Sequence, residues 1–370
     1  MTLSHYRTLG RSGLGVSPLA LGTMTFGTAR WGSGEATSRD VFNAYLDAGG
    51  NFIDTADVYS GGRCEEMLGR FVADRSARES VVIATKSGFA TGQGPHAGGN
   101  GAKHIQSALH ASLKRLQTDY VDLLWVHVWD SVTPAEELLE TMSQLIRAGK
   151  ARYWGISNSP AWFVAWVATL AAASGRPAPI ALQYFYSLVN RDIEEEFVPL
   201  AAEFDMAIQP WSPLAFGLLT GKYDRRTVEA AAPRAAGLPR DAASPGAERA
   251  DDDKRLDGAN PFGDALFTAR NWEIVEVVQR VSRECGESAA RVALAWVRGR
   301  RGVSSTLVGV SKVEQLRDNI ASLEVRLSDA HLAELDAVSA PAQKMLYTLF
   351  APSVRQHAVF GGSAVRAWAE

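Results

Sequence analysis

The sequence predicts an α/β fold in which eight parallel strands close into a (β/α)8 TIM barrel. Eight short apolar runs recur along the 370 residues, and helical patterns separate most of them. The runs are nearly continuous in apolar residues, as is typical of parallel strands covered by helices. An open doubly wound sheet is the alternative, but the G-x-G-x-x-G spacing that often follows its first strand is absent. Eight strand–helix units in succession favour the barrel.

The expected strands follow the apolar runs at 17–24, 51–57, 81–87, 121–127, 151–158, 180–187, 206–213 and 304–311. The expected helices are 37–48, 63–75, 103–116, 134–147, 160–173, 192–205, 271–300 and a last one near 328–338. Thr133-Pro134 and Ser159-Pro160 are typical helix starts, because proline suits the first turn and has no amide hydrogen to satisfy. The glycines within 10–15 predict a turn before the first strand.

The chain is longer than a typical barrel of about 250 residues, and two segments account for much of the additional length. An insertion at about 224–265 follows the seventh strand and is rich in Ala, Pro, Gly and charge, which is typical of an exposed loop or a lid over a ligand. A C-terminal tail at about 341–370 carries large apolar residues, which we expect to dock on a surface. The length alone would allow two domains, but the strand pattern predicts one barrel domain over residues 1–370.

Composition excludes several classes of protein. Net charge is −3, with 38 basic and 41 acidic residues well mixed, so nucleic acid is not an expected partner. The uncharged run 161–173 is too short to span a bilayer, and the N-terminus does not resemble a signal peptide, so we expect a cytoplasmic protein without a membrane. Cys64 and Cys285 form no disulfide framework and no metal-ligand spacing, so no metal site is expected.

Four polar residues follow three consecutive predicted strands: Asp54, Tyr59, Lys86 and His127. In a barrel, the carboxyl ends of the strands build the active site. Taken singly, each has an ordinary structural explanation, namely a helix cap, a rim aromatic, a solvated charge and a structural histidine. Their joint position predicts a catalytic group.

This set of side chains suits proton transfer to or from an oxygen. A tyrosine pKa near 10 is high for proton exchange at neutral pH, and a nearby lysine ammonium is expected to lower it. Asp54 would keep Lys86 charged, and His127 would orient the substrate oxygen or stabilise charge on it. Lys86 could instead act as a Schiff-base nucleophile, although a carboxylate partner favours the charged amine.

Motifs along nearly the whole chain resemble the aldo-keto reductase family. They are ALGTMTFG (20–27), NFIDTADVYSGGRCEEMLG (51–69), VVIATKSG (81–88), SLKRLQTDYVDLLWVH (112–127), GKARYWGISN (149–158), LQYFYSLVNR (182–191), PWSPLAFGLLTGKY (210–223), ALAWV (293–297) and GVSKVEQLRDN (309–319). SNSPAW and the FGG near the C-terminus are most similar to bacterial members and to the aryl-alcohol dehydrogenase branch. The potassium-channel beta subunits are also close. Cys64 and Trp211 depart from a usual serine and a common tyrosine.

The resemblance implies an NADPH-dependent carbonyl reductase, with NADH the less favoured cofactor. Tyr59 would be the proton donor of the tetrad with Asp54, Lys86 and His127. Trp211 would stack on the nicotinamide, and Ser311 and Lys312 would hold a 2′-phosphate. The resemblance implies cofactor contacts from Gly22, Thr23, Met24, Asp54, Ser157, Asn158, Gln183, Trp211, Ser212, Pro213, Leu214, Gly217, Lys222, Arg255, Gly309, Ser311, Lys312, Gln315 and Asn319.

The expected substrate is a small-molecule aldehyde or ketone, reduced reversibly to an alcohol. Aromatic residues in loops after the strands would favour aromatic or apolar carbonyls, and with two tetrad members the expected pocket comprises Trp31, Tyr59, Phe89, His127, Trp129 and Phe216. Two other functions remain open at this point, a cofactor-sensing regulatory subunit and a Schiff-base aldolase. The channel subunits of this scaffold carry asparagine where this chain has His127, which favours the enzyme. A monomer and a homo-oligomer are both compatible with the sequence.

Overall fold

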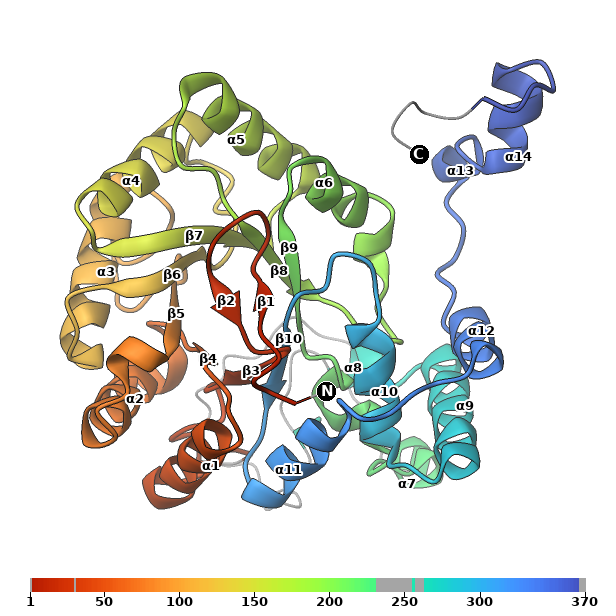
Figure 1. Cartoon of the computed structure of the whole chain (residues 1–370), viewed down its shortest axis with the longest axis horizontal. Helices are drawn as coiled ribbons and strands as arrows, with labels where there is room; N and C mark the ends of the chain where they lie inside the picture. Colours follow the sequence, from red (N-terminus) through yellow and green to blue (C-terminus); the bar gives the residue numbers. More distant parts are fainter. Residues whose placement is uncertain (1, 30, 231–254, 257–262, 366–370) are drawn as a thin grey trace.

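The computed structural model describes residues 2–29, 31–230, 255–256 and 263–365. Parallel strands in the order β10-β3-β4-β5-β6-β7-β8-β9 surround the molecular centre, and helices lie outside them (Figure 1). Between β9 and β10, the Ile208 amide donates to Gly302 O at 2.8 Å and Ile208 O accepts from the Ser304 amide at 3.2 Å, which nearly closes the barrel. The predicted (β/α)8 TIM barrel is confirmed.

Each barrel strand falls within one predicted apolar run. The strands are β3 (Leu19–Gly22), β4 (Phe52–Asp54), β5 (Val82–Ser87), β6 (Val121–Val126), β7 (Ala151–Ser157), β8 (Ala181–Phe185), β9 (Ala207–Trp211) and β10 (Thr306–Gly309). Trp125 fills part of the core. A Cβ on Gly155 would come within 2.3 Å of this indole, so the neighbouring strand needs glycine there.

The outer helices are α1 (Glu35–Asp47), α2 (Arg63–Asp74), α3 (Ala102–Leu116), α4 (Ala135–Arg147), α5 (Ala161–Ser174), α6 (Phe197–Glu203), α9 (Ala269–Cys285), α10 (Ala289–Arg298), α11 (Val313–Ala321) and α12 (Asp329–Val338). The prediction of one helix over 271–300 was wrong. Gly286 adopts a left-handed φ of 67°, which ends α9, and the Ser288 side chain caps α10. The helix expected over 192–205 is a 3-10 turn, Asp192–Glu194, followed by α6.

An antiparallel hairpin of β1 (Arg7–Thr8) and β2 (Gly15–Val16) precedes the barrel, confirming the turn expected over 10–15. A Cβ on Gly10 would lie 2.2 Å from Ile180 O and 2.8 Å from Asp205 O, at the amino ends of β8 and β9. The hairpin therefore packs against the amino-terminal end of the barrel, in front of the sheet in Figure 1. The opposite end carries the carboxyl ends of the strands.

Most of the expected insertion at 224–265 lies outside the described residues, between α7 (Arg225–Ala230) and α8 (Gly263–Leu266). The tail forms α13 (Met345–Thr348), α14 (Pro352–Val354) and a π-helical turn, Arg355–Val359. In Figure 1 the tail lies outside the ring of helices. Within the described part of the chain, no helix combines the length and the apolar character needed to cross a membrane.

Candidate active site

The four predicted catalytic residues meet at the carboxyl end of the barrel. Asp54 is the last residue of β4, Lys86 lies near the end of β5, and His127 directly follows β6. Tyr59 begins a 3-10 turn, Tyr59–Gly62, after β4. Parallel pairing of β4, β5 and β6 aligns the strand ends, so residues far apart in the sequence become neighbours.

Lys86 is the centre of this group. Its ammonium forms an ion pair with Asp54 and donates hydrogen bonds to Thr55 O at 2.9 Å and to the Tyr59 hydroxyl at 3.3 Å. Lys86 and Asp54 are almost completely buried. Burial disfavours the ammonium, but the Asp54 carboxylate and Tyr59 outweigh burial and raise the pKa of Lys86. Lys86 is therefore a charged donor at neutral pH.

Burial raises the pKa of Tyr59 above its ordinary value, and the Lys86 ammonium offsets only part of that shift. Lys86 does lower this pKa, as expected, but the net shift is upward because removing the phenolate from water costs more than the neighbouring cation returns. The phenol consequently keeps its proton at neutral pH. A protonated hydroxyl next to an ammonium is suited to giving a proton to an oxygen and stabilising the phenolate that remains.

His127 lies against Tyr59 edge to face, with ring centroids 6.0 Å apart. Its backbone amide donates to Ser87 O at 2.9 Å, which places the imidazole at the end of β6. Burial, and then the charge of Lys86, lower the pKa of His127 well below its ordinary value. The ring is therefore neutral near pH 7 and has one N–H that can donate to a polar group.

A second buried carboxylate lies behind this group and was missed in the sequence analysis. Both carboxylate oxygens of Asp57 are buried without a hydrogen-bond partner among the described residues. Burial, reinforced by the neighbouring Glu65, raises the pKa of Asp57 to about 7. Glu65 itself pairs with Arg115 at 2.7 Å. The position of Asp57 in DTADVY, between Asp54 and Tyr59, was the available signal.

The ends of β7, β8 and β9 bring together several expected cofactor residues. Asn158 has a left-handed φ of 43°, and its amide nitrogen donates to His127 O at 2.9 Å. The Trp211 indole donates to the Asn158 amide oxygen at 3.2 Å. Ser157 donates to Gln183 O at 2.7 Å, whereas the Gln183 amide nitrogen donates to Asp54 at 2.9 Å. These bonds connect the expected nicotinamide contacts to the tetrad.

The loop after β9 has an unusual backbone. Ser212, Ala215 and Phe216 have φ values of 48°, 48° and 57°, and Gly217 has a φ of 94°. Ala215, Phe216 and Gly217 are thus three consecutive left-handed residues, and the Ala215 and Gly217 amides donate within the turn to Ser212 O at 2.8 Å and to Leu214 O at 2.9 Å. A Cβ on Gly217 would meet Lys222 Cε at 2.5 Å, so glycine allows this lysine to cross the loop. Pro213 and Leu214 complete the expected segment.

The expected adenosine segment joins β10 to α11. Gly309 pairs with Gly22 across the β10–β3 ladder, and Lys312 occupies the N-cap of α11 without a side-chain cap. The Gln315 side chain accepts from the Ser311 amide at 2.9 Å. Asn319 is buried within α11. The helix N-terminus, with its partial positive charge, thus follows directly after Ser311 and Lys312.

Arg255 lies against residues of the expected cofactor site and of the expected substrate pocket. Its guanidinium is 4.1 Å from the Trp31 ring centroid and 4.6 Å from that of Phe216. One guanidinium nitrogen is 3.5 Å from Met24 Sδ. Thr23, next to Met24, donates to Asp54 O at 3.1 Å. The structure thus brings Arg255 to the end of the site that follows β3.

The aromatic residues expected in the substrate pocket differ in their surroundings. Phe89 is 42% exposed, and its ring centroid lies 4.6 Å from that of His127. Trp129 instead packs edge to face on Trp162 of α5, at 5.5 Å. Phe185, which was missed, stacks on Trp211 at 4.9 Å; its place at the end of an apolar run was the signal.

Comparison with known proteins agrees with this geometry. The model of the Aldo/keto reductase family matches residues 18–340. The chain is 35% identical over 323 residues to a probable voltage-gated potassium channel subunit beta of Oryza sativa, covering 87% of this chain and 92% of that protein. It is 34% identical over 344 residues to an aryl-alcohol dehydrogenase of Pestalotiopsis microspora, covering 90% and 82%.

A third relative, a norsolorinic acid reductase of Aspergillus flavus, is 31% identical over 346 residues, covering 90% of this chain and 81% of that protein. Two of these three relatives are named as oxidoreductases, and all three align over most of the chain. The barrel, the residues at its carboxyl end and the family match lead to one assignment. The chain belongs to the aldo/keto reductase family and is an NAD(P)H-dependent oxidoreductase.

Proposed function

We propose that the protein catalyses the reversible, NADPH-dependent reduction of an aldehyde or ketone to an alcohol, with Tyr59 as the proton donor. One observation carries the proposal: a partly buried, protonated Tyr59 phenol lies next to both the Lys86 ammonium, 3.3 Å away, and the neutral His127 ring. Carbonyl reduction needs a proton at the oxygen, and this arrangement supplies one.

The residues present fit a nicotinamide dinucleotide. The half-buried Trp211 ring, fixed by Phe185 and by its bond to Asn158, is a flat apolar surface of the kind a nicotinamide stacks on. Lys222, which crosses the loop at Gly217, would place a cation beside a pyrophosphate. When bound, the nicotinamide supplies the hydride. Ser311 and Lys312 before α11 support NADPH over NADH, since a 2′-phosphate is favoured at a helix N-terminus.

The tetrad residues have distinct roles in the proposed reaction. Tyr59 gives its hydroxyl proton to the carbonyl oxygen. Lys86 stabilises the phenolate that forms, and Asp54 keeps Lys86 charged. His127 donates its ring N–H to the same oxygen and orients it. Because Asp54, Lys86 and His127 are buried and Tyr59 is partly buried, their electrostatic interactions are stronger than they would be in water.

The surroundings of the tetrad support an aromatic or apolar carbonyl substrate. Phe89 lies next to His127, while Trp31 and Phe216 flank Arg255 on the β3 side. Aromatic walls bind planar apolar groups through dispersion and ring stacking. Trp129 supports this wall less directly, because it packs on Trp162 of α5.

A Schiff-base aldolase is disfavoured by the state of Lys86. Attack on a carbonyl needs a neutral amine, whereas Lys86 is ion-paired with Asp54 and has a raised pKa.

We also propose one domain over residues 1–370 and a cytoplasmic location. The thiols Cys64 and Cys285, which form no disulfide, support a reducing compartment.

A titration with NADPH and NADH, followed by a panel of carbonyl substrates with wild type and Tyr59→Phe, tests the proposal. We expect tighter binding of NADPH, turnover of an aromatic aldehyde above that of a short polar sugar, and loss of reduction in Tyr59→Phe with cofactor binding retained. Full activity in the variant would refute the proton donor. Trapping of substrate on Lys86 by borohydride without NADPH would favour the aldolase.

A further inference from the structure

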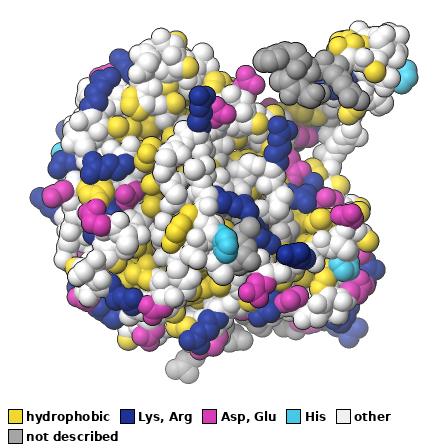
Figure 2. Space-filling model, in the orientation of Figure 1, with side chains coloured by type: hydrophobic (Ala, Val, Ile, Leu, Met, Phe, Trp, Pro, Cys, Tyr) yellow, Lys and Arg dark blue, Asp and Glu magenta, His cyan; other side chains and the backbone are white. Residues whose placement is uncertain are grey.

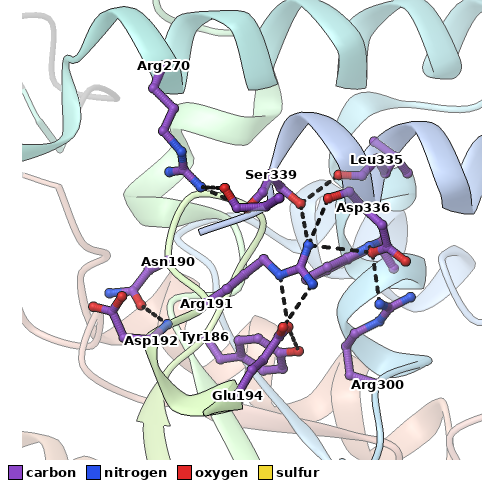
Figure 3. A network of polar contacts seen from close by, with 12 residues as sticks. Tyr186, Asn190, Arg191, Asp192, Glu194, Arg270, Arg300, Leu335, Asp336 and Ser339 are labelled. Carbon is purple, nitrogen blue, oxygen red and sulfur yellow. Dashed lines mark hydrogen bonds and ion pairs between the residues drawn. The ribbon is translucent and has the colours of Figure 1, made fainter. Parts of the chain in front are cut away.

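The base of the C-terminal tail is held in one position by a polar network. Figure 3 shows Arg191 and Arg270 converging on Ser339, at the end of α12. Arg191 donates to the Ser339 hydroxyl at 2.9 Å, and Arg270 donates to Ser339 O at 2.7 Å. A few residues on, Lys344 pairs with Glu195 at 2.6 Å. The tail therefore leaves the barrel at a defined place beside α6.

Beyond this base the tail presents apolar side chains to solvent. Met345 is 81% exposed and Phe350 is 60% exposed, and Leu346, Leu349 and Val359 are exposed as well. Hydrophobic side chains are visible on the tail in Figure 2, and the tail extends away from the helix ring in Figure 1. The tail is nevertheless folded, because α13, α14 and the π-helical turn follow one another over Met345–Val359. A folded segment with clustered exposed apolar residues is typical of an interaction surface.

A second apolar surface lies on α5. Trp162 and Trp166 are 55% and 45% exposed, and their ring centroids are 6.4 Å apart. The helix sequence AWFVAWVATLAAAS contains no charged residue. An outer helix of a barrel normally turns a polar face to water. The outward face of α5 instead lacks charge along its whole length, so it too is typical of a covered surface.

We propose that the tail of one copy docks on the α5 face of a second copy, and that the exchange is reciprocal. Each chain carries one apolar tail and one apolar acceptor, so two chains related by a two-fold axis satisfy both pairs at once. Lys344 and Tyr347 hold the start of the tail on Glu195 and Glu196 of the same chain. Beyond them the tail extends away from the helix ring, which favours a neighbouring copy as the acceptor of its apolar residues. A second copy also explains why both surfaces are apolar in the same sequence.

Sedimentation velocity of the full chain tests the exchange, over about 1 to 100 μM. We expect a dimer or an even-numbered oligomer for wild type. Two variants should sediment as monomers: Leu349→Asp with Phe350→Asp on the tail, and Trp166→Glu on α5. Tyr6→Asp is the matched control, since this side chain is 52% exposed and precedes β1 near Gly49, and the variant should remain oligomeric. Circular dichroism verifies that each variant is folded.

Mixing the two variants gives the sharpest result. The tail variant retains its α5 acceptor, and the α5 variant retains its tail, so an equimolar mixture should form heterodimers through one intact contact while each variant alone stays monomeric. A monomeric wild type over the whole range would overturn the proposal. An oligomer that persists in both variants would also overturn it. A monomeric wild type whose tryptophan fluorescence shifts in the tail variant would show that the tail docks on its own chain.

Discussion

The Lys86 ammonium donates a hydrogen bond to the Tyr59 hydroxyl across 3.3 Å while it is also paired with Asp54. This hydrogen bond makes the pKa of Tyr59 depend on the charge of Lys86. In the proposed reaction the cation would stabilise the phenolate that forms when Tyr59 gives up its proton, whereas burial keeps the phenol protonated beforehand. On this proposal the energetic benefit of Lys86 would fall mainly on the transition state, where it would accelerate the reaction.

Substitution Lys86→Met should lower kcat for carbonyl reduction by about 100-fold or more, because the phenolate would form in a buried site without its cation. NADPH affinity should change little. Steady-state and single-turnover kinetics measure the effect. Lys103→Met is the control, since this exposed lysine lies on α3. Equal kcat in wild type and Lys86→Met would contradict the role given to Lys86.

The rate of reduction should stay level through neutral pH and fall only above the ordinary tyrosine value of about 10. Tyr59 must be protonated to act as donor, and burial raises its pKa, so the loss of the donor form moves to higher pH. His127, with its lowered pKa, should add no step between about pH 6 and 8. A kcat profile at saturating NADPH tests both statements. A fall centred near neutral pH would disagree with them.

Asp57→Asn should stabilise the protein at high pH. The folded-state pKa of Asp57 is about 7, above the ordinary 3.8, so the folded state holds a proton that the unfolded state releases. Stability is therefore lost as pH rises between these two values, and the loss reaches up to about 4 kcal/mol above pH 7.

Denaturant unfolding of wild type and Asp57→Asn at several pH values measures this effect. The variant should gain stability at pH 8 and should match wild type below about pH 3, where the carboxyl is protonated in both states. Asp119→Asn is the control, because Asp119 is exposed. A pH-independent difference would assign the effect to packing rather than to ionisation.

Lys312→Ala should weaken NADPH binding by about tenfold and leave NADH binding nearly unchanged, since one charged contact to a phosphate contributes about 1–3 kcal/mol. Lys312 precedes α11, where a 2′-phosphate would meet the helix N-terminus. Fluorescence titration with each cofactor gives the two dissociation constants. An equal loss for both cofactors would place Lys312 away from the 2′-phosphate.

Phe89→Ala should lower kcat/KM for an aromatic aldehyde by about tenfold, with a smaller effect on a short aliphatic aldehyde, because ring stacking contributes about 1 kcal/mol beyond apolar burial. Phe89 is partly exposed and lies 4.6 Å from His127, between centroids. The ratio of the two kcat/KM values is the measurement. A uniform loss for both aldehydes would indicate a general effect on His127.

Helix boundaries show where sequence patterns stop being sufficient. All eight strands could be predicted, because each is a short apolar run with no competing pattern. The division of the segment 271–300 into two helices could not be predicted in this way. Its apolar periodicity continues across Gly286, whereas the backbone turns there. Gly286 and Ser288 were the local signals for the break.

The tetrad Asp54, Tyr59, Lys86 and His127 could be predicted as a group, since parallel strands in a barrel align their carboxyl ends. Burial could not be predicted in the same way. It depends on side chains from elements distant in the sequence, and it raises the pKa of Tyr59 against the pull of Lys86. Asp57 is ordinary in sequence and becomes notable only when both its oxygens are buried without a hydrogen-bond partner in the described structure.

The sequence by itself determined the alternation of strands and helices, the order of the strands and the four polar residues at their ends. The reason is that hydrophobic periodicity and residue position are local properties of the chain. Only the tertiary structure decided the protonation states at the site, the position of Arg255 between Trp31 and Phe216, and the fixed base and exposed surface of the tail. These depend on which distant segments exclude water from a side chain and which leave it exposed.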